Sequence, residues 1–276
     1  MKNLLSRSII QIITLGLCCQ PMRAQQSAFP LPDIPESLTT TEECLEYLLL
    51  NYWNQYDFDD ASPANQLAGE QGFVNFIDIM PTADSLLCAR SMARYVERAL
   101  ATTERITRFD QLAEHYLANR LSPIRNDIIY AHLLRQAISF YSTAEHKKTH
   151  SAALQRTRFI LENIDKNQVG TVASDFKFTD SDGRRRRLSN IQSPFVLIML
   201  YDPECYDCIL AKQDMEIQPV FQNPDIKIIR VLPSQVKGKY HVTATPSFYL
   251  LNSRHVVLLK DATYESILQF FEHKLK

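Results

Sequence analysis

The stretch Pro194-Phe195-Val196-Leu197-Ile198-Met199-Leu200-Tyr201, followed by Asp202-Pro203-Glu204 and then by Cys205-Tyr206-Asp207-Cys208, decides the fold of this chain. A continuous apolar run of this kind is typical of a buried strand in a parallel sheet. We expect a helix to begin at the cysteines, so that the first sulfur lies where free N–H groups and the helix dipole stabilise a thiolate. A second thiol one turn away can resolve the mixed disulfide that the first one forms. The segment therefore predicts thiol–disulfide exchange.

The sequence around this segment predicts a mixed α/β domain over residues 169–276. A helix is expected from the cysteines to about residue 220, a second buried strand at 225–232, and a closing helix at 263–275. Between them, strands at 247–251 and 255–260 form a hairpin around Asn252-Ser253. Upstream, 173–179 and 186–188 form another hairpin around Asp182-Gly183. The order predicts a parallel pair of strands that is extended by an antiparallel pair.

The first half of the chain, residues 25–168, has the pattern of an all-α domain, with glycine at only two positions. Thr40 and Glu43 form a capping box, and Asp84 can cap a later helix. Further helices are expected at about 70–79, around 106–117, after Ser122-Pro123, and from about 144 to 164. The predicted architecture is a helical domain followed by an α/β domain with a central mixed sheet flanked by helices.

The first 24 residues have the pattern of a signal peptide. Lys2 and Arg7 flank the short apolar run 9–17, and Ala24 stands at a plausible cleavage position. The run is too short to span a bilayer. A lipoprotein would need a small residue before Cys18 or Cys19, where Leu17 and Cys18 stand, so lipid anchoring is the less favoured alternative. We expect an exported, periplasmic protein that contacts a membrane only if it is lipidated.

Two motifs together resemble the thioredoxin-like superfamily. One is the strand followed by C-x-x-C, and the other is Thr245-Pro246 directly before the strand at 247–251. The resemblance covers residues 169–276. The first half is similar to a module that precedes thioredoxin-like domains in secreted bacterial proteins and has no established activity. The motifs that carry this second resemblance are Asn51-Tyr52-Trp53, Asp57-Phe58, Glu70-Gln71-Gly72-Phe73 and Ser122-Pro123-Ile124-Arg125-Asn126.

The thioredoxin-like resemblance implies a role for each motif residue. Cys205 would be the nucleophile, and Cys208 would resolve the mixed disulfide, so that the two form a redox-active disulfide. Pro246 would be a cis proline whose loop lies against the sulfurs, with the backbone of Thr245 free to pair with an extended substrate. The resemblance implies neither a cofactor nor a metal.

The sequence departs from the family pattern at three places. Glu204 precedes the first cysteine and Asp207 lies between the two, so like-charge repulsion opposes a thiolate on Cys205. Met199 stands where thioredoxins carry a buried acid. Proton transfer would then involve water, Glu204 or Asp207. We expect a less depressed thiol pKa and a more reducing dithiol than in strongly oxidising relatives.

Other pairings and sites remain as alternatives. Cys205 and Cys208 could form an inert structural bridge, and whether Cys44 and Cys88 pair is open. Zinc needs four ligands, which the motif does not supply. His146 and His150, four apart on an expected helix, fit a solvated face better than a metal site.

The charge and the aromatic residues indicate neither a nucleic-acid partner nor a ligand platform. The net charge is −1, and the run Arg184–Arg187 reads better as an exposed hairpin arm than as a nucleic-acid patch, so no nucleic-acid partner is expected. One aromatic group is interpreted as helix core rather than as a ligand platform. Its members are Tyr52, Trp53, Tyr56 and Phe58.

These observations favour an exported thiol–disulfide oxidoreductase that reduces or isomerises disulfides of other exported proteins, with an unidentified electron donor. The alternative is a non-enzymatic binding module. In that case the helical domain recognises a partner, and the thioredoxin-like domain is a scaffold with a fixed disulfide.

Overall fold

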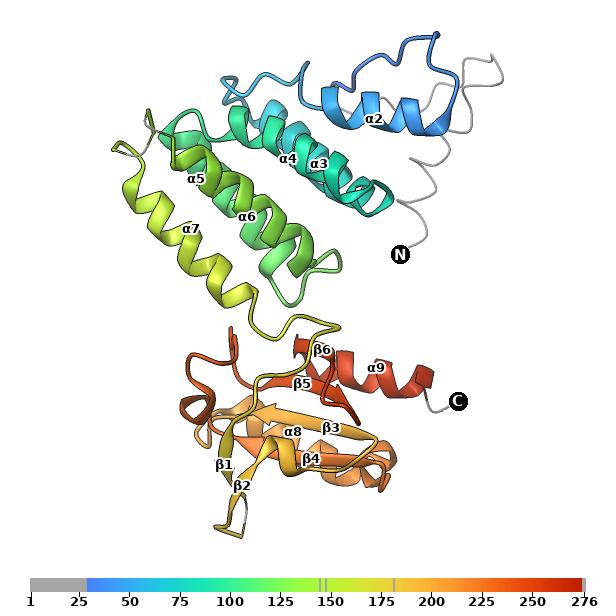
Figure 1. The fold of residues 1–276 in the computed structure, drawn as a ribbon, viewed down its shortest axis with the longest axis vertical. Coiled ribbons are helices and arrows are strands. Elements are labelled where there is room, and N and C mark those ends of the chain that lie inside the picture. The colour runs from blue at the N-terminus through green and yellow to red at the C-terminus, as the bar shows by residue number, and fades with distance from the viewer. Residues whose placement is uncertain (1–28, 144, 147, 181, 275–276) are drawn as a thin grey trace. The chain divides into compact units, whose positions relative to one another are not determined.

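The computed structural model describes residues 29–143, 145–146, 148–180 and 182–274, so the predicted signal peptide lies outside the described residues. The chain forms two compact units, which divide between Arg158 and Phe159. Figure 1 shows the helices of the first unit and the sheet of the second. The domain boundary expected at residue 168 stays a prediction.

The N-terminal unit is all-α in its described residues, which confirms the predicted class. Its main helices are α2 (Thr41–Asn51), α3 (Pro63–Ile79), α4 (Ser85–Ala99), α5 (Thr103–Ala113) and α6 (Asp127–Tyr141), followed by α7 (Ser151–Ile164), which crosses the division. A 3₁₀ turn at Met80–Thr82 follows α3, and a π-helical turn at Glu114–Ala118 follows α5. Buried apolar side chains of these helices form the core, with Phe73 and Phe76 of α3 fully enclosed.

Two of the expected helix caps are present. The Thr40 hydroxyl accepts from the Glu43 N–H at 3.2 Å, and the Glu43 carboxylate accepts from the Thr40 N–H at 3.1 Å, which confirms the capping box. The Asp84 carboxylate accepts from the N–H groups of Leu86 and Leu87 at the start of α4.

Three expected helix starts were wrong. α3 begins at Pro63 rather than near residue 70, because Ser62 caps it and proline suits its first position. α6 begins at Asp127 and not at Ser122-Pro123, because Asn126 is the residue that accepts from the first free N–H groups. α7 begins at Ser151 rather than near residue 144, so His146 and His150 lie in turns before it.

Two glycines of α3, Gly69 and Gly72, allow other side chains to pack closely against this helix. A Cβ atom on Gly69 would lie 2.2 Å from the Tyr56 hydroxyl, and one on Gly72 would lie 2.2 Å from the ring of Phe29. Phe29 in turn contacts Tyr52 and Trp53, with ring centroids 5.0 Å apart in both pairs. Phe29, in the segment that precedes α2, therefore lies in the aromatic core of the unit.

The C-terminal unit contains a central sheet of strand order β4-β3-β5-β6. The strands are β3 (Phe195–Leu200), β4 (Ile226–Val231), β5 (Ser247–Asn252) and β6 (Val257–Ala262). β3 pairs in parallel with β4 and antiparallel with β5, and β5 pairs antiparallel with β6, which confirms the predicted mixed sheet. A separate hairpin of β1 (Lys177–Thr179) and β2 (Arg185–Arg187) precedes it.

Alternate residues of β3 face two different cores. Leu197 and Met199 pack with side chains of α8 (Tyr206–Ile217) and α9 (Tyr264–Lys274). Val196, Ile198 and Leu200 pack with the β1–β2 region and the segment around Val236 and Tyr240. The period of two follows from strand geometry. Among the described residues, no helix is both long enough and apolar enough to cross a membrane.

Candidate active site

The two cysteines lie at the start of α8, directly after the central strand β3. Asp202 closes the turn between β3 and α8. Its carboxylate accepts from the Glu204 N–H at 2.9 Å, and its carbonyl accepts from the Cys205 N–H at 3.1 Å. Cys205 is then the N-cap residue of α8. The strand, the turn and the cap together place its sulfur at the positive end of the helix dipole.

The Cys205 sulfur is half-buried and receives hydrogen bonds from its own helix. The Cys208 N–H donates to Cys205 Sγ at 3.3 Å, and Cys205 Sγ lies 3.5 Å from the Thr245 carbonyl oxygen, to which the thiol donates. A hydrogen bond from the Cys208 thiol, followed by one from its N–H group, lowers the pKa of the Cys205 thiol below the ordinary value. Cys205 is therefore the readier thiolate of the pair.

Cys208 is 2 % exposed and packs in the core with Leu197 and Met199. Burial raises the pKa of this thiol, and its hydrogen bond to Cys205 raises the pKa further. Both cysteines are free thiols in the structure. The pair therefore combines an accessible sulfur that ionises easily with an enclosed sulfur that retains its proton.

Thr245 and Pro246 lie beside the cysteines although forty residues separate them in sequence. The Thr245–Pro246 peptide bond is cis, and Pro246 leads directly into β5. The contact between Cys205 Sγ and the Thr245 carbonyl joins this loop to the start of α8. The structure thus brings together the two sequence motifs on which the resemblance rests.

A buried carboxylate on β6, which sequence reasoning missed, supports the same loop. Asp261 is fully buried, and its two oxygens accept from the hydroxyls of Thr243 and Ser247, both at 2.7 Å. These residues flank Thr245 and Pro246. The backbone of Asp261 has a φ of 44°, a conformation that aspartate tolerates better than most residues. The one available signal was an aspartate near the end of a largely apolar strand that also contains Lys260.

The residues named for tuning lie at the surface. Glu204 and Asp207 are exposed, and no hydrogen bond in the described part of the chain joins either carboxylate to a sulfur. Met199 is buried beside Cys208. Any effect of these two acids on the sulfurs would therefore act through space and would be screened by solvent and salt.

Exposed apolar side chains occur in the first part of α8, after the half-buried Cys205. Tyr206 is 71 % exposed, and Ile209 and Leu210 are each 44 % exposed. Exposed apolar residues in one place often mark an interaction surface. These three side chains are therefore a candidate contact surface for a polypeptide.

The remaining candidates belong to the N-terminal unit. The Cys44 and Cys88 thiols are free, and the Cys88 thiol donates to the Met80 carbonyl at 3.1 Å. The rings of His146 and His150 are 5.7 Å apart, and no group of metal-binding side chains occurs among the described residues.

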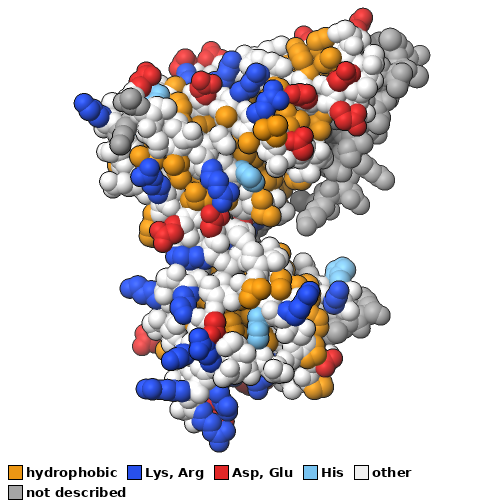
Figure 2. Space-filling view, viewed as in Figure 1, with side chains coloured by type: hydrophobic (Ala, Val, Ile, Leu, Met, Phe, Trp, Pro, Cys, Tyr) orange, Lys and Arg blue, Asp and Glu red, His pale blue; other side chains and the backbone are white. Residues whose placement is uncertain are grey.

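The arginine run lies on the β1–β2 hairpin, and Figure 2 shows blue basic side chains gathered on this part of the C-terminal unit. Several of these charges are paired within the hairpin region: Arg186 bonds Asp180 at 2.8 Å, and Arg187 bonds Asp175. The run is thus partly neutralised by its own neighbours.

Comparisons with known proteins agree with this architecture. The family model described as "Domain of unknown function (DUF5106)" matches residues 16–167. A solved thioredoxin-like protein from Bacteroides caccae is 23 % identical and has a TM-score of 0.69, over 89 % of this chain and 98 % of that one. This likeness shows the fold. No curated protein matches the chain significantly.

Two shorter structures are similar to part of the chain. The C-terminal domain of an uncharacterized protein from Bacteroides fragilis is 23 % identical, over 38 % of this chain and 98 % of that one, with a TM-score of 0.35. The thioredoxin domain of a thiol-disulfide oxidoreductase from Bacteroides vulgatus is 14 % identical, over 38 % of this chain and 98 % of that one, with a TM-score of 0.31.

Proposed function

The chain belongs to the family described as a domain of unknown function (DUF5106), and from this premise we propose that its thioredoxin-like domain is a thiol–disulfide oxidoreductase. Its substrates are disulfides of other exported proteins, which it reduces or isomerises. The observation that carries the proposal is the difference between the two thiols. The pKa of Cys205 is lowered at the helix N-cap, whereas the pKa of the enclosed Cys208 is raised.

The reaction begins with the Cys205 thiolate attacking one sulfur of a substrate disulfide. A mixed disulfide forms, and the other substrate sulfur leaves as a thiolate that takes up a proton. Cys208 then loses its proton and attacks Cys205 Sγ, which breaks the mixed disulfide and releases the second substrate thiol. The substrate has gained two electrons and two protons, and Cys205–Cys208 has become a disulfide. A dithiol donor must reduce it again.

The surroundings of Cys205 favour a polypeptide substrate. The exposed Tyr206, Ile209 and Leu210 offer apolar surface beside the sulfur, and the Thr245 backbone lies within reach of it. A polypeptide could pack on the first group while its own backbone lay along the second. A small disulfide such as oxidised glutathione would use little of this surface.

Export is part of the same proposal. Lys2, Arg7, the apolar run at 9–17 and Ala24 support cleavage of a signal peptide, which would deliver the dithiol to the periplasm. Fractionation of bacteria that express the chain, with the mass of the product recovered, tests this directly. A product that retains residues 1–24 in the cytoplasm would contradict it.

Insulin reduction in the presence of dithiothreitol tests the activity. We expect turnover by the full chain and by Cys88→Ser, a matched control in the helical unit, and none by Cys205→Ser. Equal rates for the Cys205→Ser variant and the full chain would contradict the proposal. They would favour the alternative binding module with an inert scaffold.

Trapping identifies the natural substrate. Replacement of Cys208 by alanine removes the resolving thiol, so the mixed disulfide on Cys205 should persist and be recovered under non-reducing conditions. The double variant Cys205→Ser, Cys208→Ala is the control. Adducts that form equally well on the control would show that trapping does not proceed through Cys205.

A further inference from the structure

The helical unit contains a cavity of about 130 Å³ beside its aromatic cluster. Rings of Trp53, Tyr56, Phe58, Tyr95 and Phe109 line it. The centroids of Trp53 and Tyr95 are 4.6 Å apart, and those of Tyr56 and Phe58 are 4.8 Å apart. An apolar cavity of about 150 Å³ is large enough to bind benzene. This cavity therefore has room for one small ring.

The Tyr56 ring, which forms one wall of this cavity, is held in place against α3. The Tyr56 hydroxyl donates to the Asn65 carbonyl at 3.2 Å, at a place where the bare backbone of Gly69 lets the ring approach α3. The hydrogen bond and this close approach hold the ring against the helix. Tyr56 thus forms one wall of the cavity and cannot readily swing in to fill it.

Hydrogen-bond donors without acceptors gather at this cavity. Within the described residues, Trp53 Nε1 and Arg105 Nε are buried and have no partner, and both residues line it. Tyr95 lines the same cavity, and its hydroxyl is a further donor that a ligand oxygen could meet. A buried donor without an acceptor is unfavourable by about 1–3 kcal/mol. A ligand with an acceptor oxygen would relieve this cost.

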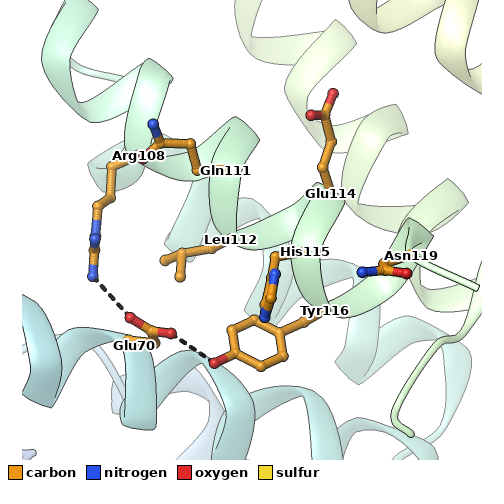
Figure 3. Close-up of a pocket in the computed structure, with 8 residues that line it drawn as sticks. All are labelled: Glu70, Arg108, Gln111, Leu112, Glu114, His115, Tyr116 and Asn119. Carbon is orange, nitrogen blue, oxygen red and sulfur yellow. Dashed lines mark hydrogen bonds and ion pairs between the residues drawn. The ribbon is translucent and has the colours of Figure 1, made fainter. Parts of the chain in front are cut away.

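The two arginines of the wall are already neutralised. Arg105 forms an ion pair with Asp59. Arg108 lies 3.5 Å from Glu70, and Figure 3 shows this carboxylate between Arg108 and Tyr116, whose hydroxyl donates to it at 2.6 Å. Arg108 also borders the wider, more polar cavity of Figure 3, of about 540 Å³. Asp60 and Glu104 also line the aromatic cavity, and their carboxylates would repel an anion. With its arginines paired, the cavity therefore favours an uncharged ligand over an anionic one.

We propose that this aromatic cavity of the helical unit is a binding site for a small uncharged ring compound that carries an acceptor oxygen. The rings of Trp53, Tyr95 and Phe109 contact its apolar body. The donors of the same wall satisfy its oxygen. The residues of this site belong to a different unit from Cys205 and Cys208, and the proposal does not depend on the redox proposal.

Phenol and toluene are suitable probes because they have nearly the same shape and differ by a hydroxyl and a methyl group. Trp53 is the single tryptophan of the chain, so its fluorescence reports on this cavity directly. In a titration of the full chain we expect saturable changes, with phenol bound about two- to tenfold more tightly than toluene. A purely apolar cavity would give the reverse order, because the hydroxyl would lose its water partners.

Two variants with matched controls locate the binding. Ala61 is exposed and lines the cavity, so Ala61→Leu should remove saturable binding of both probes, whereas Ala64→Leu, also exposed but away from the cavity, should not. Tyr95→Phe should weaken phenol toward the level of toluene. Tyr130→Phe changes another buried tyrosine of the unit and should leave both affinities unchanged.

Thermal unfolding of each variant establishes that it is folded before binding is compared. The proposal is overturned if phenol gives no saturable change, if toluene binds as well as phenol, or if Ala61→Leu binds both probes normally. Tighter binding of benzoate than of phenol would overturn the preference for an uncharged ligand.

Discussion

The backbone N–H of Cys208 donates a hydrogen bond of 3.3 Å to the sulfur of Cys205. The bond joins the N-cap residue of α8 to the third residue of the helix, so the same contact that caps the helix also stabilises a thiolate. One short motif therefore sets both the local structure and the order in which the two sulfurs ionise.

The pKa values of the two thiols should be shifted in opposite directions from that of an ordinary cysteine. In a Cys44→Ser, Cys88→Ser background, we expect Cys205 to be alkylated by iodoacetamide at lower pH than a model thiol, and Cys208 only at higher pH. The folded state gains stability from Cys205 above the unfolded pKa, and this gain is lost as the pH falls through the lowered pKa. The gain from Cys208 is present below the unfolded pKa and is lost as the pH rises through the raised pKa. Mass spectrometry of the two alkylated cysteines checks the order, and faster reaction of Cys208 at neutral pH would contradict it.

Neutralising the two exposed acids should make the dithiol more oxidising. In Glu204→Gln, Asp207→Asn, less negative charge opposes the Cys205 thiolate, so its pKa should fall and the reduced form should be stabilised. Equilibration in glutathione buffers measures the potential, which we expect to lie well below about −120 mV in the unchanged chain and to rise in the variant. Glu216→Gln, at the far end of α8, is the control. A lower potential in the double variant would refute a role for these acids.

Ser247→Ala should destabilise the C-terminal unit by about 1–3 kcal/mol, because the buried Asp261 carboxylate loses one of its two hydroxyl donors. Unfolding in urea can be followed by the reaction of the enclosed Cys208 with a thiol reagent. Ser193→Ala removes an exposed hydrogen bond to Asp225 and should change stability by less than about 0.5 kcal/mol. Equal effects of the two substitutions would show that Asp261 does not depend on Ser247.

The apolar surface on α8 should matter for protein substrates and not for small ones. We expect Ile209→Ser, Leu210→Ser to slow insulin reduction severalfold while leaving reduction of a small aromatic disulfide nearly unchanged. Ile217→Ser is the matched control, since Ile217 is 75 % exposed but lies about 18 Å along the helix from Cys205. If both substrates slowed equally, the surface would be acting on the thiols themselves.

Gly72→Ala should destabilise the helical unit even though alanine favours helix. The added Cβ would lie 2.2 Å from the buried ring of Phe29. Overpacking costs about 1–3 kcal/mol, against a gain of up to about 1 kcal/mol in helix propensity. Urea unfolding followed by Trp53 fluorescence measures the difference, with Gln71→Ala on the exposed face of α3 as control. A net gain in stability would mean that Phe29 is displaced at no cost.

The site could be read from the sequence where its signal was local. The run Phe195–Leu200 and the two cysteines lie within fifteen residues, and their order alone predicts a strand, a turn and a capped helix. Thr245-Pro246 was found through its resemblance to a known pattern.

Asp261 was missed because its partners are distant in sequence. Thr243 lies eighteen residues away and Ser247 fourteen, and only the pairing of β5 with β6 brings the three together. The hairpin expected at 255–260 was also taken to end one residue too early to include it.

The predicted start of a helix was wrong where two capping signals competed. Ser122-Pro123 has the form of a helix start, yet the Ser122 hydroxyl donates to the Tyr116 carbonyl, and Asn126 caps α6 instead. The choice depends on tertiary contacts of the π-helical turn before it.

In the same way, periodicity assigned the aromatic group to the core but could not show that its rings also enclose a cavity.

The position of β3 between β4 and β5 also has a kinetic consequence. Both edges of this strand are bonded over its full length, so exposing its amide groups to solvent requires two ladders to open together. Its amides should therefore be among the slowest to exchange hydrogen in the C-terminal unit. Cys205 thus follows the strand whose backbone hydrogen bonds we expect to open least often. We therefore expect the loop that carries Thr245, rather than β3, to move when a polypeptide binds.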